Sequence, residues 1–236
     1  MQRLGIILPS SNTTVEYEFS KALADTDVSV HFARVPLKDV TVQNLEGMEC
    51  ALEGAAHLLA DASVDVVAFA CTSGSLVKGI GYDAQLARRI SKAAGCSALT
   101  TSGAVIDALK TLGANRICLG TPYLDEVASR EVSFLEDNGF EVIREKSLSL
   151  KNNLKIGRLT PSNAEVLAKE AFTGKADTVF ISCTNFRTFE ALSTLELELG
   201  VAVISSNSAT LWAALKMLRV GSTVSLGRLF DLAKKH

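Results

Sequence analysis

Two cysteines, Cys71 and Cys183, occupy equivalent places in the chain and are the residues best suited to carry out chemistry. Each follows a strand-like apolar run and precedes a threonine. The two stretches read VDVVAFACT at residues 64–72 and ADTVFISCT at residues 176–184, with the cysteines 112 residues apart (71 to 183). A thiolate is a strong nucleophile, and a thiol also gives or takes a proton. The pair predicts either a nucleophile with an acid–base partner or two acid–base groups.

The other three cysteines, Cys50, Cys96 and Cys118, are predicted to be core residues, because a lone cysteine is usually buried. Five cysteines are an odd number, and their wide spacing favours reduced thiols over a framework of disulfides. A redox disulfide between Cys71 and Cys183 is disfavoured, because the chain lacks a Cys-x-x-Cys pair.

Polar turns follow both of the paired cysteines. Thr72 and Ser73 begin a Thr-Ser-Gly-Ser turn, and Thr184 and Asn185 come directly after Cys183. Backbone N–H groups and hydroxyls at a helix start hold carboxylates or phosphates, although such turns also arise as simple helix caps. We expect these four residues to contact an anionic ligand. We also expect helix N-termini beside both cysteines to lower their pKa values.

Three further polar residues are candidates for binding a ligand. Asn12 follows the first predicted strand, where it either caps the next helix or points to the site. Tyr123 follows Thr-Pro at a strand end, where a phenol either packs at a helix start or donates to an anion. Asn153 lies in the irregular segment 147–157, a loop that can cover a site.

The apolar pattern alternates between buried strands and amphipathic helices. Residues 4–8 form the first strand-like run, and Val15, Phe19 and Leu23 share one face of the helix that follows. The same order of strand and helix recurs along the chain, with strands that are apolar throughout. This pattern predicts an α/β protein with parallel sheets and right-handed crossovers.

The second half of the chain repeats the first. Besides the two cysteine stretches, LTTSGA at 99–104 resembles ISSNSA at 204–209. We expect two pseudo-symmetric lobes with parallel sheets of the flavodoxin-like or Rossmann-like kind. The first comprises residues 1–101 and 207–236, with a C-terminal helix that returns to it after Leu226, and the second comprises residues 102–206. Ligands bind beyond the carboxyl ends of parallel strands, so both thiols should face an active site in the interlobe cleft.

Composition excludes several classes of protein. The 236 residues include 24 basic and 26 acidic side chains, a net charge of −2, and the basic residues are scattered, so nucleic-acid binding is not expected. No apolar run approaches the roughly 18 residues of a membrane span, and no signal peptide is recognisable, so we expect no membrane association and a cytoplasmic location.

Metal and dinucleotide sites are also not expected. His31, His57 and His236 stand too far apart for a short metal-ligand motif. The stretch GIGYDA at 79–84 resembles a dinucleotide-binding loop only superficially, because it does not directly follow a strand.

The motifs together resemble the aspartate/glutamate racemase superfamily and, within it, the maleate cis-trans isomerase branch, which is similar to arylmalonate decarboxylases. The similarity extends along nearly the whole chain. It rests on the strings LPSSNTTVE at 8–16, ACTSGS at 70–75, TPY at 121–123, NLKIGRL at 153–159, ISCTNFRT at 181–188 and SSN at 205–207.

The resemblance implies an enzyme without a cofactor that acts on a small dicarboxylate, and a homodimer. It implies that Cys71 adds to the alkene of maleate and that Cys183 acts as proton donor and acceptor. It places Asn12, Tyr123 and Asn153 at the two carboxylates. Arylmalonate decarboxylases lack the first cysteine, so Cys71 argues against decarboxylation, and racemases usually continue with Asn-Thr where this chain has Thr-Ser.

Two other functions use the same residues differently. A racemase of an amino acid or a hydantoin would use one thiolate to remove a proton and the other thiol to deliver one to the opposite face. A two-lobed solute-binding protein would bind without catalysis. The paired thiols and the missing export signal disfavour it.

Overall fold

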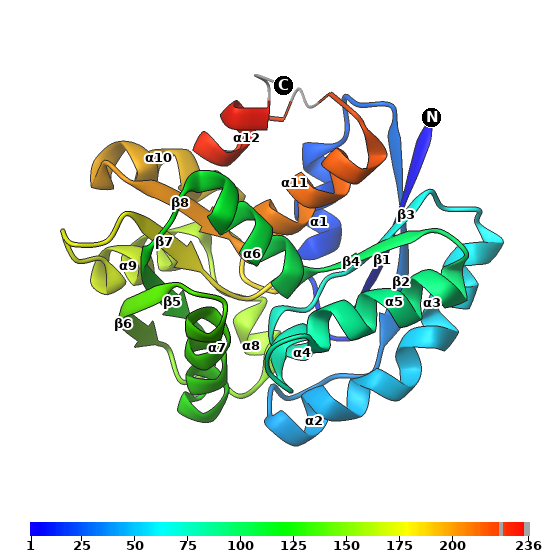
Figure 1. The fold of residues 1–236 in the computed structure, drawn as a ribbon, viewed down its shortest axis with the longest axis horizontal. Coiled ribbons are helices and arrows are strands. Elements are labelled where there is room, and N and C mark those ends of the chain that lie inside the picture. Colours follow the sequence, from blue (N-terminus) through cyan, green and yellow to red (C-terminus); the bar gives the residue numbers. More distant parts are fainter. Residues whose placement is uncertain (222–223, 234–236) are drawn as a thin grey trace.

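A computed structural model describes residues 1–221 and 224–233 of the chain (Figure 1). These residues form two four-stranded sheets in which every neighbouring pair of strands is parallel. The first sheet has the order β2-β1-β3-β4 and the second the order β6-β5-β7-β8, so the two share one topology. The predicted α/β fold with two similar lobes is confirmed. The strands are β1 (Gln2–Pro9), β2 (Val28–Val35), β3 (Val66–Phe69), β4 (Ser97–Thr100), β5 (Arg116–Thr121), β6 (Glu141–Ser147), β7 (Thr178–Ile181) and β8 (Ala202–Ser205).

Helices join the strands and cover the sheets. The segment 147–157, expected to be irregular, contains one short helix, α8. The helices are α1 (Val15–Ala22), α2 (Val42–Gly47), the 3₁₀ helix η1 (Met48–Ala51), α3 (Leu52–Asp61), α4 (Thr72–Leu76), α5 (Tyr82–Ala94), α6 (Thr101–Leu112), α7 (Asp125–Asp137), α8 (Asn153–Ile156), α9 (Pro161–Ala171), α10 (Phe189–Leu199), α11 (Ser206–Leu218) and α12 (Arg228–Ala233).

The central strand β1 is apolar on both faces because both faces are covered. Leu4 and Ile6 belong to one buried apolar cluster and Ile7 to another, as the two-residue period of a strand requires. The cluster that contains Leu4 also includes Phe180 of β7 and Trp212 of α11. The hydrophobic core is therefore continuous between the lobes.

The repeated stretches LTTSGA and ISSNSA are the beginnings of α6 and α11. The Thr100 hydroxyl accepts a hydrogen bond from the N–H of Gly103, and the Ser205 hydroxyl accepts one from Ser208, so each stretch caps its helix. The two helices pack against each other, and α11, although it follows a strand of the second sheet, also contacts β3 and β4 of the first (Figure 1). This packing joins the lobes around a shared helix pair.

The C-terminal helix α12 packs against β8 of the second sheet and against α6 and α11 (Figure 1). The N–H of Arg228 donates to Glu196 of α10, which also belongs to the second half of the chain. The tail therefore contacts the second sheet and also α11, most of which the sequence analysis assigned to the first lobe, and its return to that lobe stays a prediction. Residues 234–236 lie outside the described residues, and the lobe boundaries near 101 and 206 stay a prediction.

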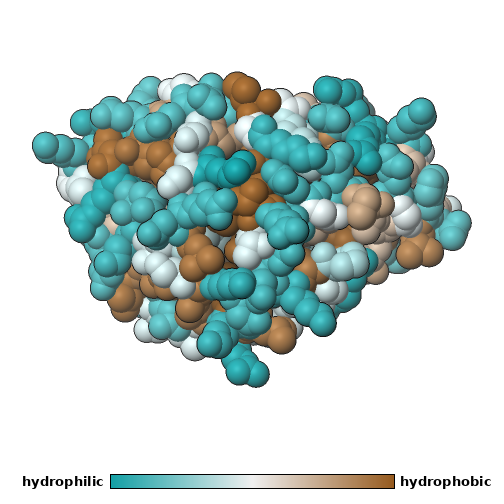
Figure 2. Space-filling model, turned by 90° about the horizontal axis from the view of Figure 1, so that it is seen from below, coloured by the Kyte–Doolittle hydropathy of each residue, from teal (hydrophilic) through white to brown (hydrophobic). Residues whose placement is uncertain are grey.

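The helices within the described ranges include none with both the length and the apolar character needed to cross a bilayer. On the face seen in Figure 2, apolar residues form separate small groups within a mainly hydrophilic surface.

Truncation of Phe19 tests the packing between the lobes. Its side chain is fully buried in α1 and stacks on Phe189 of α10, with ring centroids 6.2 Å apart. We expect Phe19→Ala to lower the free energy of unfolding by about 3–5 kcal/mol in chemical denaturation, because it leaves a cavity in the core. Leu197→Ala is the control, since this side chain is 86% exposed and its loss should change stability little. Equal effects of the two substitutions would contradict this packing.

Candidate active site

A small cavity lies at the carboxyl ends of strands from both sheets. Both Cys71 and Cys183 line it, which confirms that the two thiols face one space between the lobes. Every residue predicted for the site lines this cavity except Thr72. The lining residues are Pro9, Asn12, Leu37, Val40, Cys71, Ser73, Tyr123, Asn153, Cys183, Thr184 and Asn185.

Leu37 and Val40 are lining residues that the sequence analysis did not identify. Both are almost completely buried and follow the end of β2, so they form an apolar part of the wall. Their position just after the carboxyl end of a strand could have indicated a place in the site. An apolar residue in a short loop is more often part of the hydrophobic core, so this position alone does not identify them.

Cys71 is the residue before α4 and has extended backbone angles (φ −151°, ψ 107°). The backbone N–H of Gly74 and the hydroxyl of Ser73 favour its thiolate. A Cβ atom at Gly74 would lie 2.8 Å from the Cys71 sulfur, so only glycine leaves room for the thiol here. Burial outweighs the hydrogen bonds and raises the pKa of Cys71 to about 11.

Cys183 has a backbone φ of +92°, in a region that residues with a side chain rarely adopt. Such strain is characteristic of functional sites. Its sulfur accepts a hydrogen bond from the N–H of Asn185 at 3.4 Å and one from the Tyr123 phenol. Burial again dominates and raises the pKa of Cys183 to about 12.

The expectation that helix N-termini lower both thiol pKa values is wrong. Cys71 does precede a helix, but α4 is short and the sulfur is buried. Cys183 is followed by a turn, and α10 begins only at Phe189. The free-energy cost of removing a thiolate from water is larger than the stabilisation that these few N–H groups provide.

Thr72 is the predicted binding residue whose side chain points elsewhere. Its hydroxyl donates to the hydroxyl of Ser206 at 2.7 Å, and the backbone N–H of Cys183 donates to the same oxygen at 3.0 Å. Ser206 is the first residue of α11 and is fully buried. It therefore joins the turns that carry the two cysteines, a role that no short motif in the sequence indicated.

The asparagine side chains hydrogen-bond to protein groups as well as lining the cavity. The side-chain oxygen of Asn12 accepts from the N–H groups of Thr14 and Val15 at the start of α1, whose N-cap residue is Thr14, while its amide donates to the Thr184 hydroxyl at 3.2 Å. Asn12 therefore contacts the start of the helix and also lines the cavity, the two positions that the sequence analysis considered for it.

Asn153 and Asn185 connect the loops around the cavity. The Asn153 side chain donates to the Ser11 hydroxyl at 2.8 Å. The Asn185 side chain donates to the Asn153 carbonyl at 2.7 Å and accepts from the N–H of Thr13. The loops after β1 and β7 and the helix α8 are therefore held in one arrangement.

The cavity lining contains no Lys, Arg, His, Asp or Glu side chain among the residues that the structure describes. A carboxylate in this space would be held by neutral donors such as amides, hydroxyls and the phenol of Tyr123. The described residues also contain no group of three or more His, Cys, Asp or Glu side chains that would hold a metal ion.

The remaining cysteines differ in their surroundings. Cys118 is fully buried in β5, as predicted, and Cys96 is half-buried. Cys50 is exposed on η1, where its thiol donates to the Gly47 carbonyl, so its assignment to the core is wrong. Cys50 lies on the outward side of a helical turn whose buried residue is Met48.

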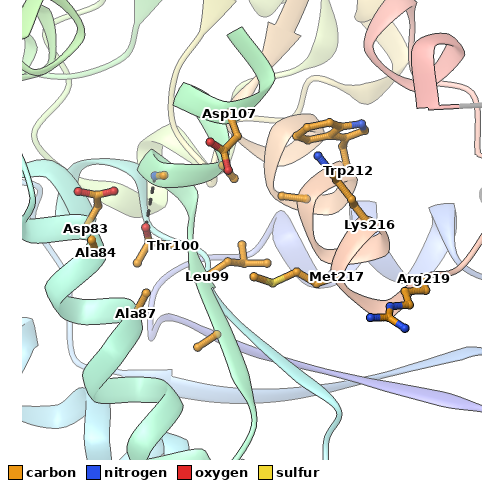
Figure 3. A pocket seen from close by; sticks show the side chains of 14 residues that line it. Asp83, Ala84, Ala87, Leu99, Thr100, Asp107, Trp212, Lys216, Met217 and Arg219 are labelled. Atoms are coloured by element: carbon orange, nitrogen blue, oxygen red, sulfur yellow. Dashed lines mark hydrogen bonds between the residues drawn. The ribbon is translucent and has the colours of Figure 1, made fainter. Parts of the chain in front are cut away.

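A larger groove of about 1050 Å³ lies between α5, α6 and α11 (Figure 3). Ala84 and Ala87 of α5 face Trp212 and Met217 of α11 across it, and its lining residues include no cysteine. Neither Cys71 nor Cys183, nor any other residue predicted for the site, lines this groove. The smaller cavity is therefore the candidate active site.

Enlargement of Gly74 tests the placement of the Cys71 thiol. We expect Gly74→Ala to slow alkylation of Cys71 by iodoacetamide about tenfold or more at pH 9, because the new methyl group displaces the sulfur from the Ser73 and Gly74 donors. Gly54→Ala is the matched control, since nothing lies within 4 Å of a Cβ there. Alkylation of Cys71 at the wild-type rate, measured by peptide mass analysis, would show that the contact does not constrain the thiol.

Comparison with known proteins agrees with this geometry. The family model of arylmalonate decarboxylase matches residues 4–230. A maleate isomerase from Geobacillus stearothermophilus is 31% identical over 235 residues, which are 94% of this chain and 94% of that protein. A solved structure shows a cysteine-to-alanine variant of a maleate isomerase from Pseudomonas putida S16 with maleate. Its TM-score with this protein is 0.93 at 28% identity, and the match covers 98% of this chain and 97% of that one.

A second solved structure contains a covalent intermediate. It is a cysteine-to-serine variant of Nocardia farcinica maleate cis-trans isomerase with a covalently bound succinylcysteine. Its TM-score is 0.92 at 25% identity, covering 100% of this chain and 99% of that one. On the match of nearly the whole chain, this protein is an enzyme of the arylmalonate decarboxylase/maleate isomerase family, within the aspartate/glutamate racemase superfamily.

Proposed function

We propose that this protein is a cofactor-independent cis-trans isomerase that converts maleate, or a closely similar small dicarboxylate, to its trans isomer. The observation that carries the proposal is that Cys71 and Cys183 line one small cavity whose other polar groups are neutral. The maleate isomerases among the relatives support the choice of substrate.

The reaction begins with the Cys71 thiolate. Its sulfur forms a bond to one alkene carbon, and the π electrons move to the other carbon and its carboxylate group. The Cys183 thiol gives its proton to that second carbon and becomes a thiolate. The former double bond is now single and rotates. The Cys183 thiolate then takes a proton from the same carbon, the carbon–sulfur bond breaks, and the trans product leaves with Cys71 again a thiolate.

Neutral donors suit both carboxylates of such a substrate. We propose that Asn12, Tyr123 and Asn153 bind them, with Ser73, Thr184 and Asn185 completing the lining. Thr72 contributes by fixing the first cysteine turn through Ser206. Because burial raises the pKa values of both free thiols, the reactive thiolate is scarce at low pH, and turnover rises as the pH increases from about 6.

The racemase alternative uses the same two thiols but needs different recognition. The ammonium group of an amino acid requires an acceptor, and the described cavity lining contains no carboxylate. A hydantoin lacks that charge, so it remains the alternative substrate to test. Cys71 argues against decarboxylation, and assembly as a homodimer is a further proposal that sedimentation of the purified protein tests.

The direct experiment is a proton NMR time course with maleate as the sole substrate. We expect the maleate signal to be replaced by that of fumarate without added cofactor. Aspartate, glutamate and a hydantoin are then incubated in D₂O. Exchange of an α-proton together with unchanged maleate would contradict the isomerase proposal and favour the racemase.

Replacement of the two cysteines should have different effects. Cys71→Ala removes the nucleophile and should abolish fumarate formation, whereas Cys183→Ser leaves a poorer acid and should lower kcat by about 10²–10⁴-fold. The exposed Cys50→Ser variant is the control and should keep wild-type kinetics. An active Cys71→Ala enzyme would rule out the covalent route.

Each substitution that removes one hydrogen bond to a substrate carboxylate should lower kcat/KM. Asn153→Ala or Tyr123→Phe each removes one hydrogen bond to a charged group, a loss of about 1.5–3 kcal/mol, which corresponds to a roughly tenfold to hundredfold lower kcat/KM. Tyr17→Phe, a change to an exposed phenol on α1, serves as the matched control. Wild-type kcat/KM in both site variants would contradict the assignment.

A further inference from the structure

Glu131 is one of the buried acids that the proposed mechanism does not use, and its partners lie close to Cys183 and Tyr123 in the chain. Glu131 of α7 is 1% exposed, and one of its carboxyl oxygens accepts a hydrogen bond from the Ser182 hydroxyl at 2.5 Å. The Thr121 hydroxyl also donates to this carboxyl group. The other oxygen, Oε2, has no hydrogen-bond partner among the described residues. A carboxyl group is costly to bury in this way, and native proteins seldom leave one half-satisfied.

The two partners of Glu131 lie directly behind the candidate active site. Ser182 is the residue before Cys183, and Thr121 ends β5, two residues before Tyr123. The Thr121 hydroxyl in turn accepts from the N–H of Tyr123 at 3.5 Å. Glu131 therefore connects the ends of the two strands that carry the acid–base thiol and the phenol beside it.

The charged and titratable groups that act on Glu131 are all acids. Glu145 of β6 lies near enough to disfavour its ionisation, and Glu131 itself disfavours ionisation of Cys183 and Tyr123. Within the described part of the chain, no basic side chain is among the groups that influence Glu131, and the short helix α4, which packs on α7, contains no charged residue. Burial raises the pKa of Glu131 to about 8, so the group is neutral at pH 7.

We propose that Glu131 is a positioning residue for Cys183, whose neutral carboxyl group permits the Cys183 thiolate to form during turnover and whose ionisation opposes it. The proposal rests on the acid–base role given to Cys183 above. In that cycle one negative charge moves from Cys71 through the substrate to Cys183. A second buried negative charge beside Cys183 raises the energy of the state in which Cys183 is the thiolate.

The consequence for pH dependence follows from the sign of this interaction. Below about pH 8 Glu131 is protonated, and thiolate formation is limited by the thiols alone. Above that pH Glu131 ionises and opposes formation of the thiolate, so the rise of turnover with pH should flatten. Glu131→Gln keeps the shape of the side chain without its charge, and turnover should then continue to rise.

The test measures Cys183 directly and needs no substrate. In a Cys71→Ala background, the rate of iodoacetamide alkylation of Cys183 is compared between proteins with and without the Glu131→Gln substitution, from about pH 6.5 to 9.5. At about pH 6.5 we expect the two proteins to be alkylated at about the same rate. At about pH 9.5 we expect alkylation to be about tenfold faster in the Glu131→Gln protein, because a like-charge interaction of about one pKa unit corresponds to a factor of ten. Glu136→Gln, an exposed acid on the same helix, should give a ratio near one throughout.

A ratio that is the same at every pH would overturn the proposal, because a merely structural role changes access and not titration. Should Glu131→Gln fail to fold, Ser182→Ala retains the acid and removes a donor that favours its ionised form. The pH at which Glu131 begins to slow alkylation should then move upward, and an unmoved profile would equally overturn the proposal. Absence of maleate turnover in the wild-type enzyme would reject the proposed function but leave this comparison intact.

Discussion

The hydroxyl group of Ser206 accepts hydrogen bonds from both turns that carry Cys71 and Cys183, and the arrangement of the candidate site depends on this contact. Its position at the first turn of α11 places it where a helix following the second sheet crosses onto the first. The hydroxyls of Thr101 and Thr210, 2.8 Å apart, join the helix pair α6 and α11 in the same region. The distance between the two thiols is therefore set by core helices and not by surface loops, as preorganised catalysis requires.

The same packing buries both thiols. Desolvation of the two buried sulfurs raises the pKa values of both thiols. The loops above the cavity also pair across the lobes: the N–H of Val40 donates to the Lys151 carbonyl, and that of Asn153 to the Lys38 carbonyl. Burial strengthens the electrostatic interactions among the groups that line the cavity.

Much of this architecture could be predicted from the sequence because it is local or repeated. The strand ends at Cys71 and Cys183 carry a strong apolar pattern, and the repeat required them to occupy equivalent places. The pKa values of the thiols could not be predicted in this way, since they depend on burial by residues distant in the chain. Ser206 and Glu131 were missed for a related reason: a serine in a helix cap and a glutamate on an amphipathic helix have no distinguishing local pattern.

The central claim is that Cys71 bonds to the substrate while Cys183 moves the proton. Its most direct test is mass analysis of the Cys183→Ser protein after brief incubation with maleate and an acid quench. We predict a mass increase equal to one molecule of maleic acid, located on the peptide that contains Cys71 and absent from a Cys71→Ala, Cys183→Ser double variant. An unmodified Cys71 peptide in the Cys183→Ser protein, when the wild-type enzyme converts maleate to fumarate, would contradict the account.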